Sequence, residues 1–507
     1  MSDQRSVRWW PLWAILVFDL GLVTYLQLFQ ESLLGFLMMA SQILTFLLAF
    51  LWLMFLSRLP GKTRLGWLGG ILGFIALFFT LFRVKDIDGD LVPTFTWRWS
   101  KTEYSSKITR GNTELEQGKI EDYPQYLGRG RDAIVKKIQL ERDWKQHPPK
   151  LLWERSVGLG WSAFAVKDKL AVTQEQHDDK EMVICYELDT GKIKWAHEDL
   201  VRHSSPQGGV GPRSTPTIDG QFVYALGATG ILNCLQLDNG SKIWSVDIVK
   251  GNNAKIPQWG KSCSPLVIGN NVIVSAGGKE NRSLVAYNKE TGKFVWGGGT
   301  DESSYSSPAI ATIHGVQQIL MFNRYTVAAH NPDNGSILWE HEWSKRGSAN
   351  IAQPIVVGSQ VLFGASYGIG SKLFDISVAD GKFSAKIAWK SKRMKPKFTN
   401  MVYRDGYVYG LDSAVLGCID FKTGKRMWRD GRYGHGQLIL VGDLLLIHSE
   451  SGYLALVEAN SKEFKEISQF STLGEKTWNP PALAGNYLLL RNHRKAVCYE
   501  LAVKQSR

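Results

Sequence analysis

The sequence predicts an all-β domain, an eight-bladed β-propeller, preceded at the N-terminus by a three-helix transmembrane anchor. A repeated hairpin carries the first part of this prediction. Its clearest copy runs from Cys234 to Trp244, where Asp-Asn-Gly separates two apolar runs. Such a turn is a strong hairpin signal, because glycine adopts positive φ without steric cost and lets the two strands keep their twist. The same ten-residue spacing from a small residue to a tryptophan recurs elsewhere: Cys185 to Trp195, Ala286 to Trp296, Ala329 to Trp339 and Cys418 to Trp428.

The tryptophans give the period of the repeat. They are Trp153, Trp195, Trp244, Trp296, Trp339, Trp389 and Trp428. Their intervals run from 39 residues, Trp389 to Trp428, to 52 residues, Trp244 to Trp296. A period of roughly 40 to 50 residues made of short strands is typical of a propeller, in which each four-stranded blade buries its faces only against its neighbours. A further hairpin, residues 455–465, fits the period but lacks the glycine and the tryptophan.

The two ends of the repeat region predict how the ring closes. The spacing that follows Cys498 would place a tryptophan one position beyond Arg507, while Trp153 has no hairpin partner before it. We therefore expect the strand around Trp153 to complete the blade that contains Cys498, which leaves no open sheet edge. Counting the hairpins then gives eight blades within residues 150–507.

The composition provides enough material for a large core and a second region, since the chain has 507 residues of which 44% are hydrophobic. A net charge of +13 suits an anionic neighbour, either a lipid headgroup or an anionic polymer. The charge alone does not exclude nucleic acid, but a propeller outside the cytoplasm would not meet it, so no nucleic-acid partner is predicted.

The five cysteines do not indicate a disulfide or a metal site. Four of them, Cys185, Cys234, Cys418 and Cys498, stand where sister repeats have alanine. We interpret them as small buried side chains, and we expect the same of Cys263.

Three apolar runs open the chain, at residues 9–29, 33–56 and 65–82. Each is long enough to cross a hydrocarbon core of roughly 30 Å, whereas a cleaved signal peptide would be a single shorter run. They predict an integral anchor over residues 1–83, followed by an extracytoplasmic connector over residues 84–149. Asp19 lies within the first run and is expected either to make a proton or partner contact or to be protonated and hydrogen-bonded to a neighbouring helix.

Basic residues predict the orientation of this anchor. Arg5 and Arg8 precede the first run, and Arg58, Lys62 and Arg64 lie between the second and the third. Positive loops face the cytoplasm. We therefore expect a cytoplasmic N-terminus and an extracytoplasmic propeller.

The connector holds two recognisable stretches. In residues 91–99, the alternation of apolar and polar side chains predicts one extended, half-buried strand, with an aromatic anchor at the membrane interface as the alternative. Residues 122–132 are basic and interrupted by glycine, and they predict a loop.

Three motifs together resemble a known family. They are Asp-Tyr-Pro-Gln-Tyr-Leu-Gly-Arg-Gly-Arg-Asp at 122–132, Pro-Lys-Leu-Leu-Trp-Glu at 149–154, and the segment 215–230 with the Gly-x-x-x-Trp hairpins that follow it. This pattern resembles the bacterial pyrroloquinoline-quinone-like (PQQ-like) propeller repeat proteins over residues 122–501. That superfamily contains calcium- and quinone-dependent alcohol and glucose dehydrogenases and a non-catalytic propeller lipoprotein of the outer-membrane barrel assembly machinery. The resemblance implies a quinoprotein dehydrogenase-like fold in which the repeated tryptophans form a packing girdle between blades. With the predicted orientation of the anchor, it also implies a bacterial inner-membrane protein with a cytoplasmic N-terminus and a periplasmic propeller.

A candidate binding site follows from the propeller topology. Residues just before the innermost strand of each blade converge on one face of the channel. These nine residues, named here the channel-face ring, are Trp161, Arg213, Trp259, Lys261, Tyr305, Asn350, Lys397, His435 and Trp478. Their aromatic, basic and amide groups would suit an anionic or planar ligand. No carboxylate is expected in the ring, so no metal-binding or catalytic residue is predicted.

Two other stretches near this face are interpreted as ordinary surface. The five basic residues within 390–397 are expected to be solvated, or else to attract an anionic partner. Gly208-Gly-Val-Gly211 is expected to be a flexible loop.

Two functions remain open from the sequence. The favoured one is a membrane-anchored, extracytoplasmic binding or scaffolding module of the cell envelope with no cofactor and an envelope protein or anionic polymer as its partner. The alternative is a membrane-bound quinoprotein dehydrogenase that uses PQQ and calcium to oxidise an alcohol or sugar. The resemblance implies long inserts and often a vicinal cysteine pair for such enzymes, and neither is present in this sequence.

Overall fold

The computed structural model describes residues 7–29, 34–100, 109–110 and 121–504. The chain divides into two compact units, Met1–Tyr104 and Ser105–Arg507. Each unit has its own architecture.

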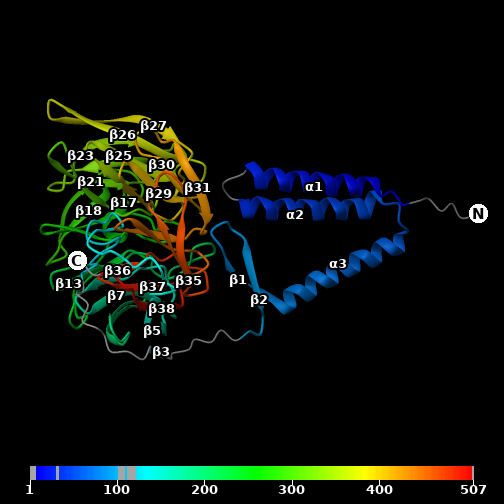
Figure 1. Cartoon of the computed structure of the whole chain (residues 1–507), viewed down its shortest axis with the longest axis horizontal. Coiled ribbons are helices and arrows are strands. Elements are labelled where there is room, and N and C mark those ends of the chain that lie inside the picture. The colour runs from blue at the N-terminus through cyan, green and yellow to red at the C-terminus, as the bar shows by residue number, and fades with distance from the viewer. Residues whose placement is uncertain (1–6, 30–33, 101–108, 111–120, 505–507) are drawn as a thin grey trace, which may run out of the picture. The chain divides into compact units, whose positions relative to one another are not determined.

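The first unit consists of helices and one hairpin. Helix α1 spans Trp10–Phe29, α2 spans Leu34–Leu51 and continues as a π-helical turn at Trp52–Leu56, and α3 spans Gly61–Leu81 (Figure 1). Helices α1 and α2 lie side by side, and a hydrogen bond of 3.0 Å from Gln42 Nε2 to Asp19 Oδ2 joins them. Of the two expectations for Asp19, the contact with a neighbouring helix is therefore present.

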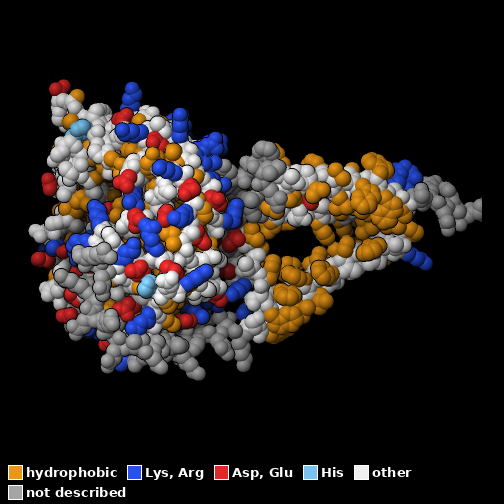
Figure 2. All heavy atoms as spheres, viewed as in Figure 1, with side chains coloured by type: hydrophobic (Ala, Val, Ile, Leu, Met, Phe, Trp, Pro, Cys, Tyr) orange, Lys and Arg blue, Asp and Glu red, His pale blue; other side chains and the backbone are white. Residues whose placement is uncertain are grey.

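The helices have an apolar outer surface. In the face shown by Figure 2, hydrophobic side chains cover most of them. Leu37–Leu56, with a mean hydropathy of 2.1, and Gly61–Leu81, with 1.7, are long and apolar enough to cross a membrane, while Trp10–Leu26 is a shorter apolar helix. Length and composition thus permit two spans within the described residues.

A hairpin follows α3 directly. Strand β1 (Phe82–Ile87) pairs antiparallel with β2 (Pro93–Trp97). The predicted strand forms over Pro93–Trp97 and not over the whole of residues 91–99. The prediction that it is half-buried is wrong for its aromatic side chains, because Phe95 and Trp97 are 43% and 45% exposed. The reason is that β1 and β2 form a two-stranded sheet, so the pleat is not covered by a second layer.

The second unit is an all-β propeller of eight sheets arranged in a ring. The first four blades are β6 (Ala165–Lys167), β7 (Leu170–His177), β8 (Lys180–Glu187) and β9 (Ile193–Asp199); β12 (Thr217–Asp219), β13 (Phe222–Leu226), β14 (Ile231–Gln236) and β15 (Lys242–Asp247); β16 (Leu266–Ile268), β17 (Asn271–Gly278), β18 (Arg282–Asn288) and β19 (Phe294–Gly298); and β20 (Ala309–Ile313), β21 (Val316–Phe322), β22 (Thr326–His330) and β23 (Ile337–Glu342).

The other four blades complete the ring. They are β24 (Ile355–Val357), β25 (Gln360–Ala365), β26 (Gly370–Ala379) and β27 (Lys382–Ser391); β28 (Met401–Arg404), β29 (Tyr407–Asp412), β30 (Val415–Asp420) and β31 (Arg426–Arg432); β32 (Gln437–Val441), β33 (Leu444–His448), β34 (Tyr453–Glu458) and β35 (Glu466–Ser471); and β36 (Ala482–Ala484), β37 (Tyr487–Arg491), β38 (Lys495–Glu500) and β5 (Lys150–Ser156). In each blade the first-named strand is the innermost of these four, and in the seventh blade β4 (Ile134–Val135) adds to its inner side.

The predicted closure of the ring is confirmed. Strand β5 pairs antiparallel with β38, and Trp153 lies opposite Cys498. The two strands are far apart in sequence, yet they belong to one blade (Figure 1). One detail was not expected: β3 (Thr109–Arg110) adds to the outer side of β5, so this blade has five strands.

A cross-link tests this closure. Lys150 and Glu500 are direct cross-strand partners, and their side chains form an ion pair of 3.4 Å. With cysteine at both positions, we expect a disulfide, because facing strand residues meet the Cα separation of roughly 4.4 to 6.8 Å that the bond requires. The readout is a faster-migrating monomer on a non-reducing gel that reverts with reductant. The matched control pairs Glu500 with Lys180, which lies in blade one, and should stay uncross-linked.

The repeated tryptophans form the girdle between blades. The indole Nε1 of Trp153 donates to Leu188 O at 2.8 Å, and that of Trp195 donates to Leu237 O at 2.7 Å. Each acceptor lies in the outer hairpin turn of the next blade. Trp244, Trp296, Trp389 and Trp428 make the equivalent bond. Trp339 is the exception, since it donates to Gln318 Oε1.

The turn glycines fit the indole rings. Gly191 has φ +65°, and a Cβ placed on it would lie 2.6 Å from the Trp153 ring. A side chain would therefore be strained by its backbone and would collide with the indole. The glycine and the tryptophan of the repeat are thus two halves of one contact between neighbouring blades.

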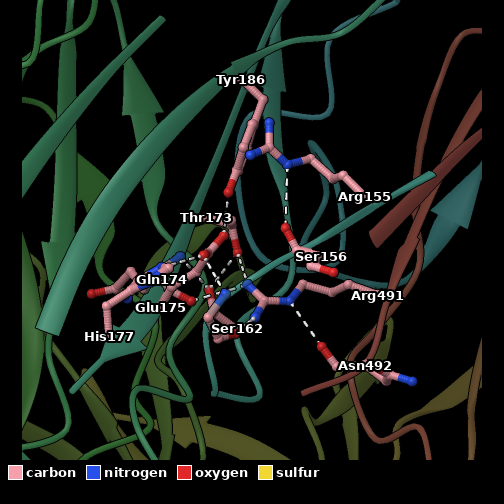
Figure 3. A network of polar contacts seen from close by, with 11 residues as sticks. Arg155, Ser156, Ser162, Thr173, Gln174, Glu175, His177, Tyr186, Arg491 and Asn492 are labelled. Atoms are coloured by element: carbon pink, nitrogen blue, oxygen red, sulfur yellow. Dashed lines mark hydrogen bonds and ion pairs between the residues drawn. The ribbon is translucent and has the colours of Figure 1, made fainter. Parts of the chain in front are cut away.

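The contact between the last and first blades also contains a buried charged network (Figure 3). Arg491, at the end of β37, is fully buried and donates to Thr173 Oγ1, Gln174 O and Gly158 O at 2.7, 3.0 and 3.0 Å. Glu175, in β7, is also fully buried and accepts from Tyr186 Oη at 2.6 Å.

The glycine-broken segment 122–132 lies inside the channel. Tyr123 bridges to Val166 of the first blade, and Arg131 Nη2 donates to Ser264 O at 3.0 Å just before the third. On the far side, Tyr126 Oη accepts from Asn400 Nδ2 at 2.9 Å, beside the sixth blade. Strand β4 (Ile134–Val135) then pairs with β32 of the seventh blade. This loop therefore occupies the channel against the inner strands.

Candidate functional site

The channel-face ring is distributed as its definition requires, with each residue in the loop that leads into an innermost strand. Trp161 precedes β6, and the others follow blade by blade: Arg213, Trp259 with Lys261, Tyr305, Asn350, Lys397, His435 and Trp478. The short innermost strands hold these loops because their backbones are bonded into buried sheets. What differs is the direction in which each side chain points.

One arc of the ring is aromatic and spans the first, eighth, seventh and sixth blades. The rings of Trp161 and Trp478 are 4.7 Å apart, and Phe398 lies 4.7 Å from Trp478 and 5.2 Å from His435. Phe398 was not predicted, although it follows the predicted Lys397 directly. Offset and tilted ring pairs at these distances are favourable and rigid.

A second group joins Trp161 to Arg213. The Trp161 indole donates to Gly208 O at 2.7 Å, and Arg213 Nη2 donates to the same oxygen at 2.6 Å. Arg213 Nη1 also donates to Gly211 O at 2.5 Å. Burial lowers the pKa of Arg213 to about 10, opposed by the charges of Tyr305 and Glu181.

These bonds order the glycine-rich stretch. Gly209–Val210 forms strand β11, which pairs with β10 (Ser204–Ser205). The prediction of a flexible loop at 208–211 is therefore wrong. The hydrogen bonds from Arg213 and Trp161 to the Gly208 and Gly211 carbonyls fix this stretch.

A third group lies at the third to fifth blades. The rings of Trp259 and Tyr305 are 5.0 Å apart, and Tyr305 Oη accepts from the Trp259 backbone at 3.3 Å. The backbone of Tyr305 donates to Asn350 O at 3.0 Å. Tyr305 thus links two neighbouring loops of the ring.

Two predicted residues have their polar groups bonded within the protein. Lys261 Nζ donates to Ala276 O at 2.6 Å and to Ser303 Oγ at 2.9 Å, and burial lowers its pKa to about 8. Asn350 Nδ2 donates to Asn323 O at 2.6 Å, while its Oδ1 accepts from Ser348 at 2.6 Å. Both side chains are buried, so they stabilise the loops from within the protein.

Cations lie over aromatic faces of the ring and of Tyr367, which lies beside the ring in the turn between β25 and β26. Lys397 Nζ is 5.4 Å from the ring of Tyr367, and Lys476 Nζ is 4.2 Å from Trp478 and 5.0 Å from Trp161. Such cation–π contacts hold ammonium groups in a fixed position. Lys476 and Tyr367 were not predicted. The only sequence signal for Lys476 is its place two residues before Trp478.

A carboxylate is present at the ring, contrary to prediction. Glu450 Oε1 accepts from Trp478 Nε1 at 2.7 Å, and its Oε2 accepts from the His435 backbone at 2.8 Å. Glu450 follows strand β33, at the repeat position that Glu175 and Asp412 hold in their own blades. Comparing the ends of the second strands would have found it.

The donor set does not fit a calcium-bound quinone. Calcium requires several convergent oxygen ligands. Both oxygens of Glu450 and the amide of Asn350 are engaged by protein donors. Across residues 7–29, 34–100, 109–110 and 121–504, no cluster of three or more His, Cys, Asp or Glu side chains could hold a metal.

The basic run at 390–397 is partly structural. Lys395 and Lys397 are 4% and 5% exposed, so the prediction of a solvated run is wrong for these two residues. Lys395 Nζ lies 2.8 Å from the buried Asp412, which Arg426 and Arg429 also approach at 3.0 Å. This cluster fixes the loop that carries Lys397.

Comparison with known proteins agrees with this architecture. The family model described as "Outer membrane protein assembly factor BamB" matches residues 179–429. The outer membrane protein assembly factor BamB of Moranella endobia (strain PCIT) is 24% identical over 306 residues, which cover 54% of this chain and 69% of that protein.

Two solved structures share the fold. The crystal structure of BamB from Moraxella catarrhalis has a TM-score of 0.51 at 14% identity and covers 71% of this chain and 99% of its own. The quinohemoprotein alcohol dehydrogenase ADHIIG from Pseudomonas putida HK5 has a TM-score of 0.51 at 13% identity, and the match covers 76% of this chain and 81% of that one. At such low sequence identities, these structures show a shared fold and nothing more. The repeat, the closed ring of eight blades and these matches show that the chain has a PQQ-like β-propeller fold, similar to that of the outer membrane protein assembly factor BamB.

Proposed function

We propose that this chain is a membrane-anchored, extracytoplasmic propeller that binds another protein of the bacterial envelope and scaffolds it without catalysis. The observation that carries the proposal is the match of residues 179–429 to the outer membrane assembly factor family. The relative from Moranella endobia bears the same description. A propeller suits this role, because its loops present a wide, rigid face.

The anchor is supported by the helices of the first unit. The segment Leu37–Leu56 is only 11% buried over its apolar window, and Gly61–Leu81 is not buried at all. Exposed apolar helices of this length are stable in lipid rather than in water. Arg58, between these helices, and Lys62 and Arg64, in the first turn of α3, favour a cytoplasmic position for this end of the helices, which leaves the propeller in the periplasm.

The channel-face ring is the proposed contact surface. Trp259, Tyr305 and Trp478 are partly exposed there, and Tyr367 is 39% exposed. Aromatic side chains beside fixed cations are typical of protein interfaces, in which few residues supply most of the binding energy. Because segment 122–132 occupies the channel, the partner would bind at the face and not thread through it. Apolar side chains on the partner would complement Trp478 and Tyr367, and acidic side chains would complement the partly exposed Lys476.

A photo-cross-linker tests this surface. With benzoylphenylalanine in place of Tyr367, we expect one discrete product with an envelope protein in intact cells, because this side chain lies beside Lys397. The matched control is Val378 in β26, which is 41% exposed and outside the ring. The product should weaken when Lys476→Glu is added, since the charge next to Trp478 is then reversed.

Three outcomes would contradict the proposal. Equal yields of cross-linked product from probes at Tyr367 and at Val378 would show that the ring is not the contact surface. Cross-linking to an anionic polymer and to no protein would show that the partner is a polymer and not a protein. A tight complex of the purified chain with PQQ and Ca²⁺ that oxidises an alcohol or sugar would establish the dehydrogenase instead.

A further inference from the structure

We infer that the β1–β2 hairpin is a lipid-binding collar, whose aromatic base lies among the headgroups at the end of the α3 span. The inference rests on the proposed insertion of α3 and adds the position at which the chain leaves the membrane. The aromatic residues concerned are Phe82, Phe95, Trp97 and Trp99.

The length of α3 sets where the membrane ends. The helix has 21 residues, which at about 1.5 Å per residue span about 31 Å, close to the roughly 30 Å of a hydrocarbon core. The hairpin starts at the very next residue, Phe82. Its base therefore falls at the lipid–water boundary.

An unbroken row of rings continues from the helix into the hairpin. Phe78 in the last turn of α3 stacks on Phe82 at 5.0 Å and meets Phe95 edge-on at 5.2 Å. Phe82 contacts Trp97 at 5.2 Å, and Trp97 contacts Trp99 at 5.5 Å. Aromatic residues, and tryptophan above all, concentrate at membrane interfaces.

These rings are exposed although they pack on one another. Trp97 and Trp99 are 45% and 60% exposed, and Val84 on the paired strand is 50% exposed. Exposed apolar side chains in one patch indicate a contact surface. Basic residues on the same hairpin, Arg83 and Lys85, suit the phosphates of headgroups.

Arg98 ties the hairpin to the helix end. Its backbone N–H donates to Leu81 O at 2.7 Å, and its Nη2 donates to Phe79 O at 2.7 Å. Carbonyls at the end of a spanning helix are costly to leave unpaired near lipid, and a cation there also complements the helix dipole. The hairpin thus completes the helix terminus and holds a fixed position beside it.

The far end of the hairpin is acidic. Asp86, Asp88 and Asp90 lie at its turn, and Asp88 Oδ1 accepts from the backbones of Asp90 and Val92 at 2.9 and 2.8 Å. At about 3.3 Å per residue, the six residues of β1 place this turn roughly 20 Å beyond the helix end. The order along the hairpin, from aromatic base to acidic tip, matches the order from interface to water.

Depth-dependent quenching tests the collar in the full chain reconstituted into lipid bilayers. A fluorophore is attached to one introduced cysteine at a time, at Leu72 in α3, at Ser100 beside the tryptophans, or at Asp90 at the tip. The native cysteines are all buried, so they do not compete for the label. Lipids brominated near the headgroup or near the acyl-chain centre serve as quenchers.

We expect the Leu72 probe to be quenched most by central bromine and the Ser100 probe most by headgroup-proximal bromine, severalfold above the Asp90 probe. With Trp97→Ser and Trp99→Ser together, quenching at Ser100 should fall towards that at Asp90, while Leu72 stays unchanged. Quenching at Leu72 without quenching at Ser100 overturns the collar and leaves the anchor standing. A Leu72 probe that is not quenched overturns the anchor, and the collar with it. Equal quenching at Ser100 and Asp90 would contradict an orientation in which the base of the hairpin lies at the membrane surface and its tip lies in water.

Discussion

Replacing Trp153 with alanine is expected to lower the free energy of unfolding of the propeller by about 3 to 5 kcal/mol, the usual cost of truncating a buried aromatic side chain. Trp153 is fully buried, and its loss would remove the ring that packs against Gly191. The Leu188 carbonyl would also lose its donor. Because Trp153 lies on β5, the strand that closes the ring, the loss affects the closing blade and the contact with the first blade together.

Denaturant unfolding of the detergent-solubilised chain, followed by circular dichroism, measures this effect. The matched control is Ile193→Ala in β9, because Ile193 is 50% exposed and surface changes usually stay within about 0.5 kcal/mol. If Trp153→Ala unfolds at the same denaturant concentration as Ile193→Ala, the girdle does not stabilise the closure.

The fold could be predicted because its signals are local. A Gly turn and a tryptophan ten residues after a small residue define one hairpin, and their recurrence defines the ring. Closure followed from counting, since Trp153 and Cys498 were each missing a partner. Strand β3 could not be predicted, because Thr109–Arg110 is too short to show a strand pattern.

The candidate site was predictable in position but not in side-chain direction. Topology places each loop at the channel face, whereas the neighbouring blade decides where a side chain in that loop points. Lys261 binds Ser303 beside the next blade, and Asn350 binds Asn323 of the preceding one. Glu450 was missed because its role depends on Trp478 and His435, which reach it from other loops.

The charged network at the closing contact gives the second large effect. Three donors point at the Glu175 carboxylate: Gly158 N at 2.6 Å, Tyr186 Oη at 2.6 Å and His177 Nε2 at 2.9 Å. Figure 3 shows the Tyr186 and His177 side chains beside Glu175 and Arg491. Burial alone would raise the pKa of Glu175, but the hydrogen bond from His177, the charge of Arg491 and the bonds from Tyr186 and Gly158 outweigh it and lower that pKa below its ordinary value.

We expect Glu175→Gln to cost about 3 to 5 kcal/mol of unfolding free energy at neutral pH, because it leaves the buried Arg491 without its counter-charge. The matched control is Glu198→Gln. Glu198 pairs with Lys180 on the same sheet at 2.8 Å, but its side chain is 54% exposed, so its loss should cost only about 0 to 1 kcal/mol. Equal effects of the two substitutions would contradict a buried charge pair.

A double-mutant cycle with Arg491→Met separates the pair from its surroundings. Each single substitution leaves one buried charge behind, whereas the double variant leaves none, so its cost should be clearly smaller than the sum of the two single costs. Additive costs would show that Glu175 and Arg491 act independently.

The pH dependence provides a check that packing alone would not produce. Since the pKa of Glu175 is lowered in the folded state, its stabilising contribution is fully present above the ordinary carboxyl value of 4.5 and is lost as the pH falls through the lower folded-state value. The difference in unfolding free energy between the native chain and Glu175→Gln should therefore be constant above about pH 4.5 and shrink below it. Other carboxylates titrate in both proteins and cancel in the difference. A difference that stays constant into the acid range would mean that Glu175 stabilises the closure by its shape and not by its charge.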